Sequence, residues 1–320
     1  MRVGKWLVAL ALLAGATSTA ADNPPNPLDL LDRMNSAIRA LDYEGRFVVQ
    51  NGYRLDALYI VHRVTGNGEL ERVVSLTGEP REIIRGDAAV ACLVPGESGP
   101  INLPRRAQGQ SYSPLTSIDG RELRQFYDLE VVGTDRVAGR AAYELHILPK
   151  DDLRFGYRLL IDQSTGLPLR SIMVDSAHQT LSQMMFTDLK VGPEVTPIER
   201  DLAALEKANA DPRSVSPLDR LAPAAWAFAD EPPGFKLNVH RRRALPDRSA
   251  ELEHFIFSDG LATVSVYVQP KQDGDALSGV SRMAAANAIG KTLAGHEVVV
   301  VGEVPVKTLD WFARSIQAAP

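Results

Sequence analysis

The stretch Phe155-Gly-Tyr-Arg-Leu-Leu-Ile-Asp-Gln-Ser-Thr-Gly-Leu-Pro-Leu-Arg-Ser171 predicts the hairpin around which the fold is built. It has two strand-like runs, 156–162 and 168–174, joined by Gln-Ser-Thr-Gly. A glycine that ends a short polar connection lets the backbone pass through positive φ, which is typical of a β-hairpin with a longer turn. Asp162 ends the first strand, where its carboxylate can accept hydrogen bonds from turn amides. Pro168 opens the second strand, a position that tolerates a missing N–H.

The sequence before this hairpin predicts one helix and a series of strands. Asn26-Pro27 is a typical helix start, and apolar residues at helical spacing extend the helix over 27–41. Residues 95–118 contain four prolines and predict a long loop. Asp119 and Glu122 are spaced as a capping box, which predicts a short second helix. The strands expected in this half are 44–50, 53–64, 69–77, 80–86 and 88–94, and those expected after residue 127 are 128–134, 139–149, 156–162, 168–175 and 179–191.

The prolines of 194–223 indicate a connector, with a helix expected over 198–208, and therefore a large domain at 22–193 and a smaller one at 224–320. Asp259-Gly260 is expected as a two-residue hairpin turn. The stretch 283–293 has an alanine-rich, helical composition, but Gly290 and Gly295 favour a strand that turns into 297–301. A helix should follow Pro305. The strands expected before that turn are 235–243, 250–258 and 261–269.

We therefore expect a mainly β fold of the α+β class. The large domain should be a strongly curved antiparallel sheet with two helices against it. The smaller domain should be an antiparallel sheet on which the C-terminal helix packs.

Residues 1–21 have the pattern of an export signal. Arg2 and Lys5 precede an apolar run over 6–14, and small residues allow cleavage after Ala20 or Ala21. The run is much shorter than the roughly 20 residues that span a bilayer. Cleavage changes the formal net charge from −5 to −7, because it removes two basic and no acidic residues. A chain this acidic is not expected to bind nucleic acid.

No pattern in the sequence predicts catalysis. The motifs of nucleophile elbows, zinc proteases, phosphate-binding loops and dithiol redox sites are absent. The six histidines are scattered, so neither a metal site nor a cofactor is expected. Cys92 is the only cysteine, which excludes an intramolecular disulfide, and its apolar surroundings favour a buried thiol.

Two groups of residues are candidates for binding. Apolar side chains on the expected strands either fill an ordinary core or line a cavity for an acyl chain, and burying about ten methylenes would give ~8 kcal/mol. A basic group either protects a strand edge or binds an acidic peptide or anionic headgroup. The candidate lipid-lining residues are Phe47, Leu58, Ile60, Phe126, Tyr157, Leu159, Met173, Met185 and Phe186. The candidate partner-binding residues are Lys236, Arg241, Arg242 and Arg243, with Arg105 and Arg106 in the long loop.

Several motifs resemble known families. The hairpin resembles the sheet of lipoprotein carriers of the LolA/LolB type. The segments beginning Phe126-Tyr-Asp-Leu, Pro232-Pro-Gly-Phe, Phe257-Ser-Asp-Gly-Leu-Ala and Val301-Gly-Glu-Val-Pro resemble the RseB/MucB family of periplasmic regulators. The similarity runs in order from about Leu30 to Ile316.

The RseB/MucB resemblance implies a non-catalytic periplasmic protein with a half-open, LolA-like first domain. It implies that the protein binds the periplasmic part of a membrane anti-sigma factor and shields it from proteolysis. It also implies release when the first domain senses lipid, lipopolysaccharide or mislocalised lipoprotein. The alternative is a lipid or lipoprotein carrier, which has no need of a second domain. Whether the protein forms homo-oligomers stays open.

Overall fold

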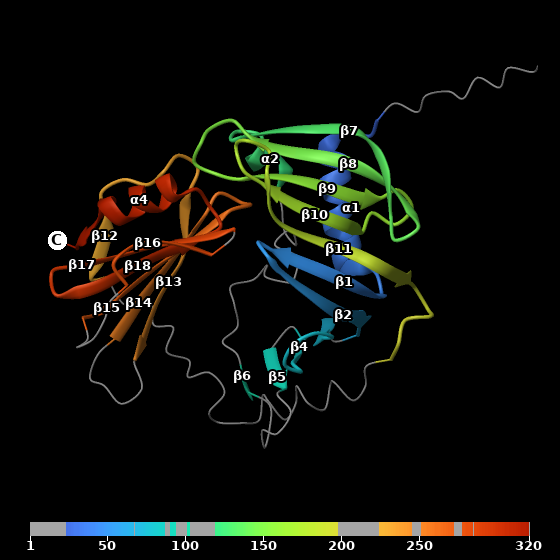
Figure 1. The fold of residues 1–320 in the computed structure, drawn as a ribbon, viewed down its shortest axis with the longest axis horizontal. Coiled ribbons are helices and arrows are strands. Elements are labelled where there is room, and N and C mark those ends of the chain that lie inside the picture. Colours follow the sequence, from blue (N-terminus) through green and yellow to red (C-terminus); the bar gives the residue numbers. More distant parts are fainter. Residues whose placement is uncertain are drawn as a thin grey trace, which may run out of the picture.

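The computed structural model describes residues 24–66, 68–86, 90–93, 101–102, 119–197, 224–244, 251–271, 277–283 and 285–319. Most of these residues belong to two antiparallel sheets, shown on the right and the left of Figure 1. We call residues 24–197 the N-terminal unit and residues 224–319 the C-terminal unit. The predicted export signal and most of the predicted connector, including its helix over 198–208, lie outside the described residues.

The N-terminal unit contains an eleven-stranded sheet in the order β6-β5-β4-β3-β2-β1-β11-β10-β9-β8-β7. The chain builds one half of this sheet outward from β1 and then returns, so that β11 pairs with β1. Among the described residues β6 and β7 do not pair with each other, so the sheet stays half-open, as expected. The strands are β1 Tyr43–Asn51, β2 Arg54–Thr65, β3 Gly68–Ser75, β4 Glu82–Gly86, β5 Val90–Leu93, β6 Ile101–Asn102, β7 Tyr127–Val137, β8 Arg140–Pro149, β9 Gly156–Asp162, β10 Pro168–Val174 and β11 Thr180–Val191.

The predicted hairpin of β9 and β10 is confirmed, and its turn is held as expected by Asp162. The Asp162 carboxylate accepts hydrogen bonds from the backbone N and the hydroxyl of Ser164, from the hydroxyl of Thr165 and from the Arg140 guanidinium. Burial alone would raise the pKa of this carboxyl, but the bonds from Ser164, Arg140 and Thr165 outweigh it and lower the pKa. Gly166 adopts φ +84°, which other residues rarely adopt.

The same turn receives the first helix, α1 (Pro27–Ala40), which is confirmed with Asn26 as its N-cap. Arg33 Nη2 donates hydrogen bonds of 2.8 Å to the carbonyl oxygens of Gln163 and Ser164. A Cβ at Gly166 would lie 2.9 Å from Arg33 Cγ, so the glycine also allows the helix to approach. The turn therefore fixes both the hairpin and the position of α1.

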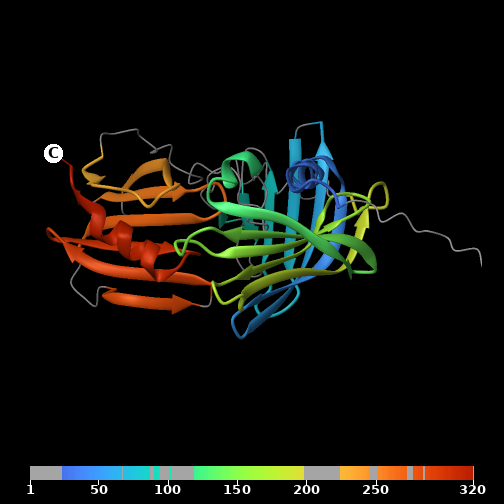
Figure 2. The same cartoon turned by 90° about the horizontal axis from the view of Figure 1, so that it is seen from above.

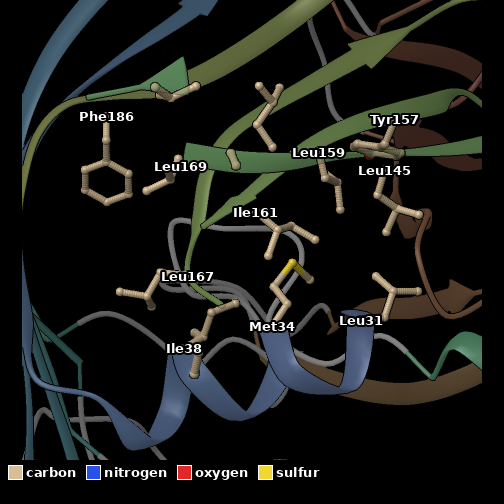
Figure 3. Packing of buried hydrophobic residues seen from close by; sticks show 14 of the residues in the cluster. Leu31, Met34, Ile38, Leu145, Tyr157, Leu159, Ile161, Leu167, Leu169 and Phe186 are labelled. Atoms are coloured by element: carbon tan, nitrogen blue, oxygen red, sulfur yellow. The ribbon is translucent and has the colours of Figure 1, made fainter. Parts of the chain in front are cut away.

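Helix α1 covers the concave side of the sheet and supplies one half of the core. Figure 3 shows Leu31, Met34 and Ile38 of α1 directed toward Leu159, Ile161 and Leu169 of the β9–β10 hairpin. The second helix, α2 (Gly120–Leu123), packs beside it, and Asp119 caps it as predicted. The alternation of the strands brings apolar residues of both halves of the sheet onto this one side.

The C-terminal unit contains a six-stranded sheet in the order β13-β14-β15-β18-β17-β16. Helix α4 (Val306–Ser315) packs on this sheet, as Figure 2 shows, and buries Leu309, Phe312 and Ala313. The strand prediction for 283–293 is confirmed from residue 286 on. The strands are β13 Lys236–Ala244, β14 Glu251–Ser258, β15 Thr263–Pro270, β16 Gly279–Met283, β17 Ala286–Leu293 and β18 His296–Gly302.

Three details of the secondary structure differ from the predictions. The expected loop 95–118 contains the two-residue strand β6. Strands β12 (Trp226–Phe228), β16 and β19 (Ile316–Ala318) were not predicted. Each is short, and β12 and β19 pair with each other from opposite ends of the C-terminal unit. The expected two-residue turn at Asp259-Gly260 is a longer connection, in which Asp259 N donates to Ala262 O.

Candidate functional site: the N-terminal core and the junction between the units

The nine candidate lipid-lining residues all belong to, or pack against, the core of the N-terminal unit. Seven of them are at most 8% exposed, and Phe126 and Met185 are partly buried. Phe47 of β1 and Phe186 of β11 meet with ring centroids 5.6 Å apart. Because α1 occupies the concave side, the seven buried residues form a packed core in this structure, and the role of all nine in lipid binding stays a prediction.

The two units meet at Arg154, a residue of the β8–β9 connection whose side chain is fully buried. Its Nη1 donates a 2.8 Å hydrogen bond to Asp259 Oδ2 in the C-terminal unit. Its Nη2 donates to Pro233 O at 2.6 Å, and its Nε donates to Asp151 Oδ1 at 3.1 Å. Every nitrogen of the guanidinium therefore has an acceptor, which a buried cation requires.

Three aromatic rings surround the same guanidinium. The Arg154 Cζ atom lies 4.7 Å from the ring centroid of Phe126, 5.2 Å from that of Phe235 and 5.5 Å from that of Tyr127. These distances are within the range of cation–π attraction. Phe126 was a lipid-lining candidate, but the structure places it here, so close to Gly234 that a Cβ there would lie 2.7 Å from its ring.

Asp259 is also fully buried, and both of its oxygens are occupied. Oδ2 accepts a second hydrogen bond from Tyr127 Oη at 2.9 Å. Oδ1 accepts from Leu261 N at 2.9 Å and from Ala262 N at 2.7 Å, which shapes the β14–β15 turn. Burial, and next the charge of Asp259, raise the pKa of Tyr127 well above its ordinary value, so this phenol stays a hydrogen-bond donor.

Two turns of the C-terminal unit reach into the N-terminal core. Leu261 is 7% exposed and Ala285 is fully buried, and both belong to the cluster that contains α1 and the large sheet. Ala285 N donates to Asn51 Oδ1 at the tip of the β1–β2 hairpin. At the start of α4, Thr308 Oγ1 donates to Leu153 O, and Lys307 pairs with Asp152 at the surface. The N-terminal core therefore extends to two residues of the C-terminal unit, and two ion pairs, Arg154–Asp259 and Lys307–Asp152, join the units.

Of the six candidate basic residues, the side chains of Lys236, Arg241 and Arg242 are described, and all three belong to β13. Strand β13 is an edge of its sheet, and alternation places Arg241 and Arg242 on opposite faces. Arg242 donates to Glu253 Oε1 at 2.7 Å, and His240 Nε2 lies 3.0 Å from Oε2 of the same carboxylate. Lys236 is exposed, and Arg241 is half-buried. The side chains of Arg243, Arg105 and Arg106 lie outside the described residues, as does that of Cys92.

A second buried carboxylate fixes the point where the chain leaves the large sheet. Glu44 Oε2 accepts hydrogen bonds from Thr196 N at 2.8 Å and Tyr59 Oη at 3.0 Å, and Oε1 accepts from Lys190 Nζ at 3.0 Å. Burial alone would raise the pKa of Glu44, but the bonds from Thr196, Lys190 and Tyr59 outweigh it and lower the pKa to about 2. The start of the connector is therefore held on β1 and β2.

Sequence reasoning missed Arg154 and Asp259 as a pair. Asp151 accepts a hydrogen bond from Leu153 N in the same connection, but nothing in the sequence analysis singled out Arg154. One signal was available: Arg154 stands between Leu153 and Phe155, an unusual place for an exposed cation. Within the described residues no three His, Cys, Asp or Glu side chains gather as a metal site would require, and no helix has the length and apolarity to cross a membrane.

Comparison with known proteins covers both units. The model of the MucB/RseB N-terminal domain matches residues 26–209, and that of the MucB/RseB C-terminal domain matches residues 220–317. The chain is 32% identical to the sigma factor AlgU regulatory protein MucB of Pseudomonas aeruginosa, over 96% of each chain. It is 26% identical to the sigma-E factor regulatory protein RseB of Escherichia coli, over 97% of this chain and 96% of that protein.

A solved structure of MucB in complex with MucA(peri) is similar in fold as well. It superimposes with a TM-score of 0.70 and 29% identity, over 92% of this chain and all of that chain. The two family models together cover both units. The chain therefore belongs to the MucB/RseB family.

Proposed function

We propose that this protein is a non-catalytic regulator that binds the periplasmic part of a membrane anti-sigma factor. The observation that carries the proposal is the match to regulatory relatives over both units, since a carrier has no need of residues 224–319. The MucB structure with MucA(peri) supports a periplasmic polypeptide as the partner. The protein acts in the periplasm after residues 1–21 are removed, and residues 22–193 and 224–320 are its two domains.

Binding shields the anti-sigma factor from proteolysis, and lipid releases it. The core around Phe47, Met173 and Phe186 is the proposed entry point for an acyl chain, which would have to displace side chains of α1 such as Met34. Lipid then favours a state of the protein that binds the partner poorly. The exposed Lys236 and the half-buried Arg241 are proposed contacts for acidic groups of the partner.

The test is a competition experiment with the full mature protein. The periplasmic segment of the host's anti-sigma factor is labelled with a fluorophore, and its binding is titrated with and without lipopolysaccharide. We expect micromolar or tighter binding that lipopolysaccharide weakens at least tenfold. Lipid binding without any binding of the segment would contradict the proposal and favour a carrier. Segment binding that ignores both lipopolysaccharide and a lipidated peptide would overturn the sensing step.

A further inference from the structure

The junction joins two charges whose environment permits only two arrangements. In the docked position, Arg154 and Asp259 are both dry, and every polar atom of either side chain has a partner. In a fully separated position, water would hydrate both charges. In an intermediate position, with the pair parted but still dry, Asp259 has no cation and Arg154 has only Asp151, so this position is strongly disfavoured.

The ion pair therefore favours two distinct states, docked and separated, and adds little net stability to the docked one. A buried salt bridge gains little net stability over separation, because the attraction is offset by the desolvation of both ions. Removing one of the two charged side chains, however, costs several times more free energy. The remaining charge stays in the apolar surroundings of Phe126, Tyr127 and Phe235. The pair therefore fixes where the C-terminal unit docks while leaving the docked state only moderately preferred.

The docked state is also tied to the packing of the N-terminal core. Leu261 lies one residue from the Asp259-Gly260 step and is buried in that core, as is Ala285. Tyr127 connects this core directly to the Arg154–Asp259 pair, because its ring belongs to the core and its hydroxyl donates a hydrogen bond to Asp259. A rearrangement of the core around α1 therefore changes the contacts that hold the C-terminal unit in place.

We propose that Arg154, Asp259 and Tyr127 form a latch that holds the C-terminal unit docked on the N-terminal unit, and that the N-terminal core controls this latch through Leu261 and Ala285. Opening exposes both charges to water and lets the C-terminal unit move as a whole. The use of the latch to release a partner rests on the proposed function, whereas the latch itself does not.

The test measures docking by the distance between two spin labels, one on each unit. Cysteines at the exposed positions Thr134 and Thr292 carry the labels, in a Cys92→Ser background. The single variants are Arg154→Met and Asp259→Asn, and the third is their combination. Asparagine in place of Asp259 keeps an oxygen for the two turn amides while removing the charge. Circular dichroism of each variant checks that both sheets remain folded.

We expect one narrow distance distribution for the parent protein. Arg154→Met leaves the buried Asp259 without a cation, which should shift the ratio of docked to separated molecules by about 100-fold toward the separated state. Asp259→Asn should shift the ratio in the same direction but less, because Arg154 keeps its pair with Asp151. The double variant has no unpaired charge and should recover most of the narrow distribution. The matched control is Lys307→Met, which removes the exposed pair with Asp152 at the same junction and should leave the distribution unchanged.

Two results would overturn the latch. One is a narrow distribution in both single variants, and the other is a double variant as broad as the single ones, since that indicates damaged packing. Control by the core is tested with Leu261→Ala, which should also broaden the distribution, and an unchanged distribution would refute that step. Unchanged affinity of the open variants for the periplasmic anti-sigma segment would refute only the use of the latch in release.

Discussion

Replacing Glu44 with glutamine tests whether a buried charge holds the end of the large sheet. The new amide oxygen can still accept from Thr196 N and Tyr59 Oη, so Glu44→Gln mainly removes the negative charge and its bond with Lys190. A change in pKa from an ordinary ~4.3 to about 2 corresponds to about 3 kcal/mol. Lys190 is 54% exposed, so solvent screens its contribution to this stabilisation. We therefore expect Glu44→Gln to lower the free energy of unfolding by about 2 kcal/mol.

The sign of the pH dependence follows from the lowered pKa. Glu44 is charged in the folded protein down to about pH 2, whereas in the unfolded chain it takes up a proton near pH 4.3. Its contribution is therefore complete above about pH 5 and disappears as the pH falls from there toward 2. Urea unfolding, followed by circular dichroism at several pH values from 7 to 3, should show the parent and the variant converging as the pH falls.

Two further measurements make this test specific. Asp188→Asn removes a carboxylate whose pair with Arg46 is exposed, and it should change the free energy of unfolding by no more than ~0.5 kcal/mol. Hydrogen exchange of the Thr196 amide should be faster in Glu44→Gln, because its acceptor has lost its charge. A difference between the parent and the variant that is equal at pH 3 and pH 7 would refute the reasoning.

Three other substitutions test the packing and the C-terminal sheet. Met34→Ala removes a fully buried side chain of α1 and should lower the free energy of unfolding by about 2–5 kcal/mol in urea melts; a loss below ~1 kcal/mol would mean that the core collapses around the gap. Gly290→Ala puts a Cβ against the backbone of Leu277 and should cost about 1–3 kcal/mol, seen in the fluorescence of Trp226 and Trp311, whereas Gly133→Ala, with open space, should not. Burial, and next Arg241, lower the pKa of His254 to about 4, so below pH 6.5 the unfolded chain takes up a proton that the folded protein does not. The free energy of unfolding should therefore decrease as the pH falls from 6.5 to 4. It should decrease less in His254→Phe, which keeps the stacking on Tyr267, and an equal dependence on pH in the two proteins would contradict this.

The parts of the fold that follow from local chemistry were predictable. The β9–β10 hairpin was recognised because Asp162, Gly166 and Pro168 act within a few residues of one another. Helix α1 was recognised from Asn26-Pro27 and its apolar spacing. Strand β16 was missed because it is only five residues long, Gly-Val-Ser-Arg-Met, and has no regular alternation of apolar and polar residues.

The candidate site was less predictable, because it depends on contacts between distant residues. Arg154 and Asp259 are 105 positions apart, and no local spacing relates them. Asp259 did give a local signal, but that signal was for a turn, which it also forms. Likewise, the pairing of Arg242 with Glu253 depends on the register of β13 and β14, which the sequence does not give.

The most direct test of the central claim is the affinity of two forms of the protein for the periplasmic segment of the host's anti-sigma factor. One form is residues 22–320 and the other is residues 22–197, and both are titrated with and without lipopolysaccharide. The account predicts that the longer form binds the segment at micromolar or lower concentration and loses affinity when lipopolysaccharide is added. It predicts that the shorter form, once shown by circular dichroism to be folded, binds the segment at least tenfold more weakly. Equal binding by the two forms, or no binding by either, would contradict a two-unit regulator.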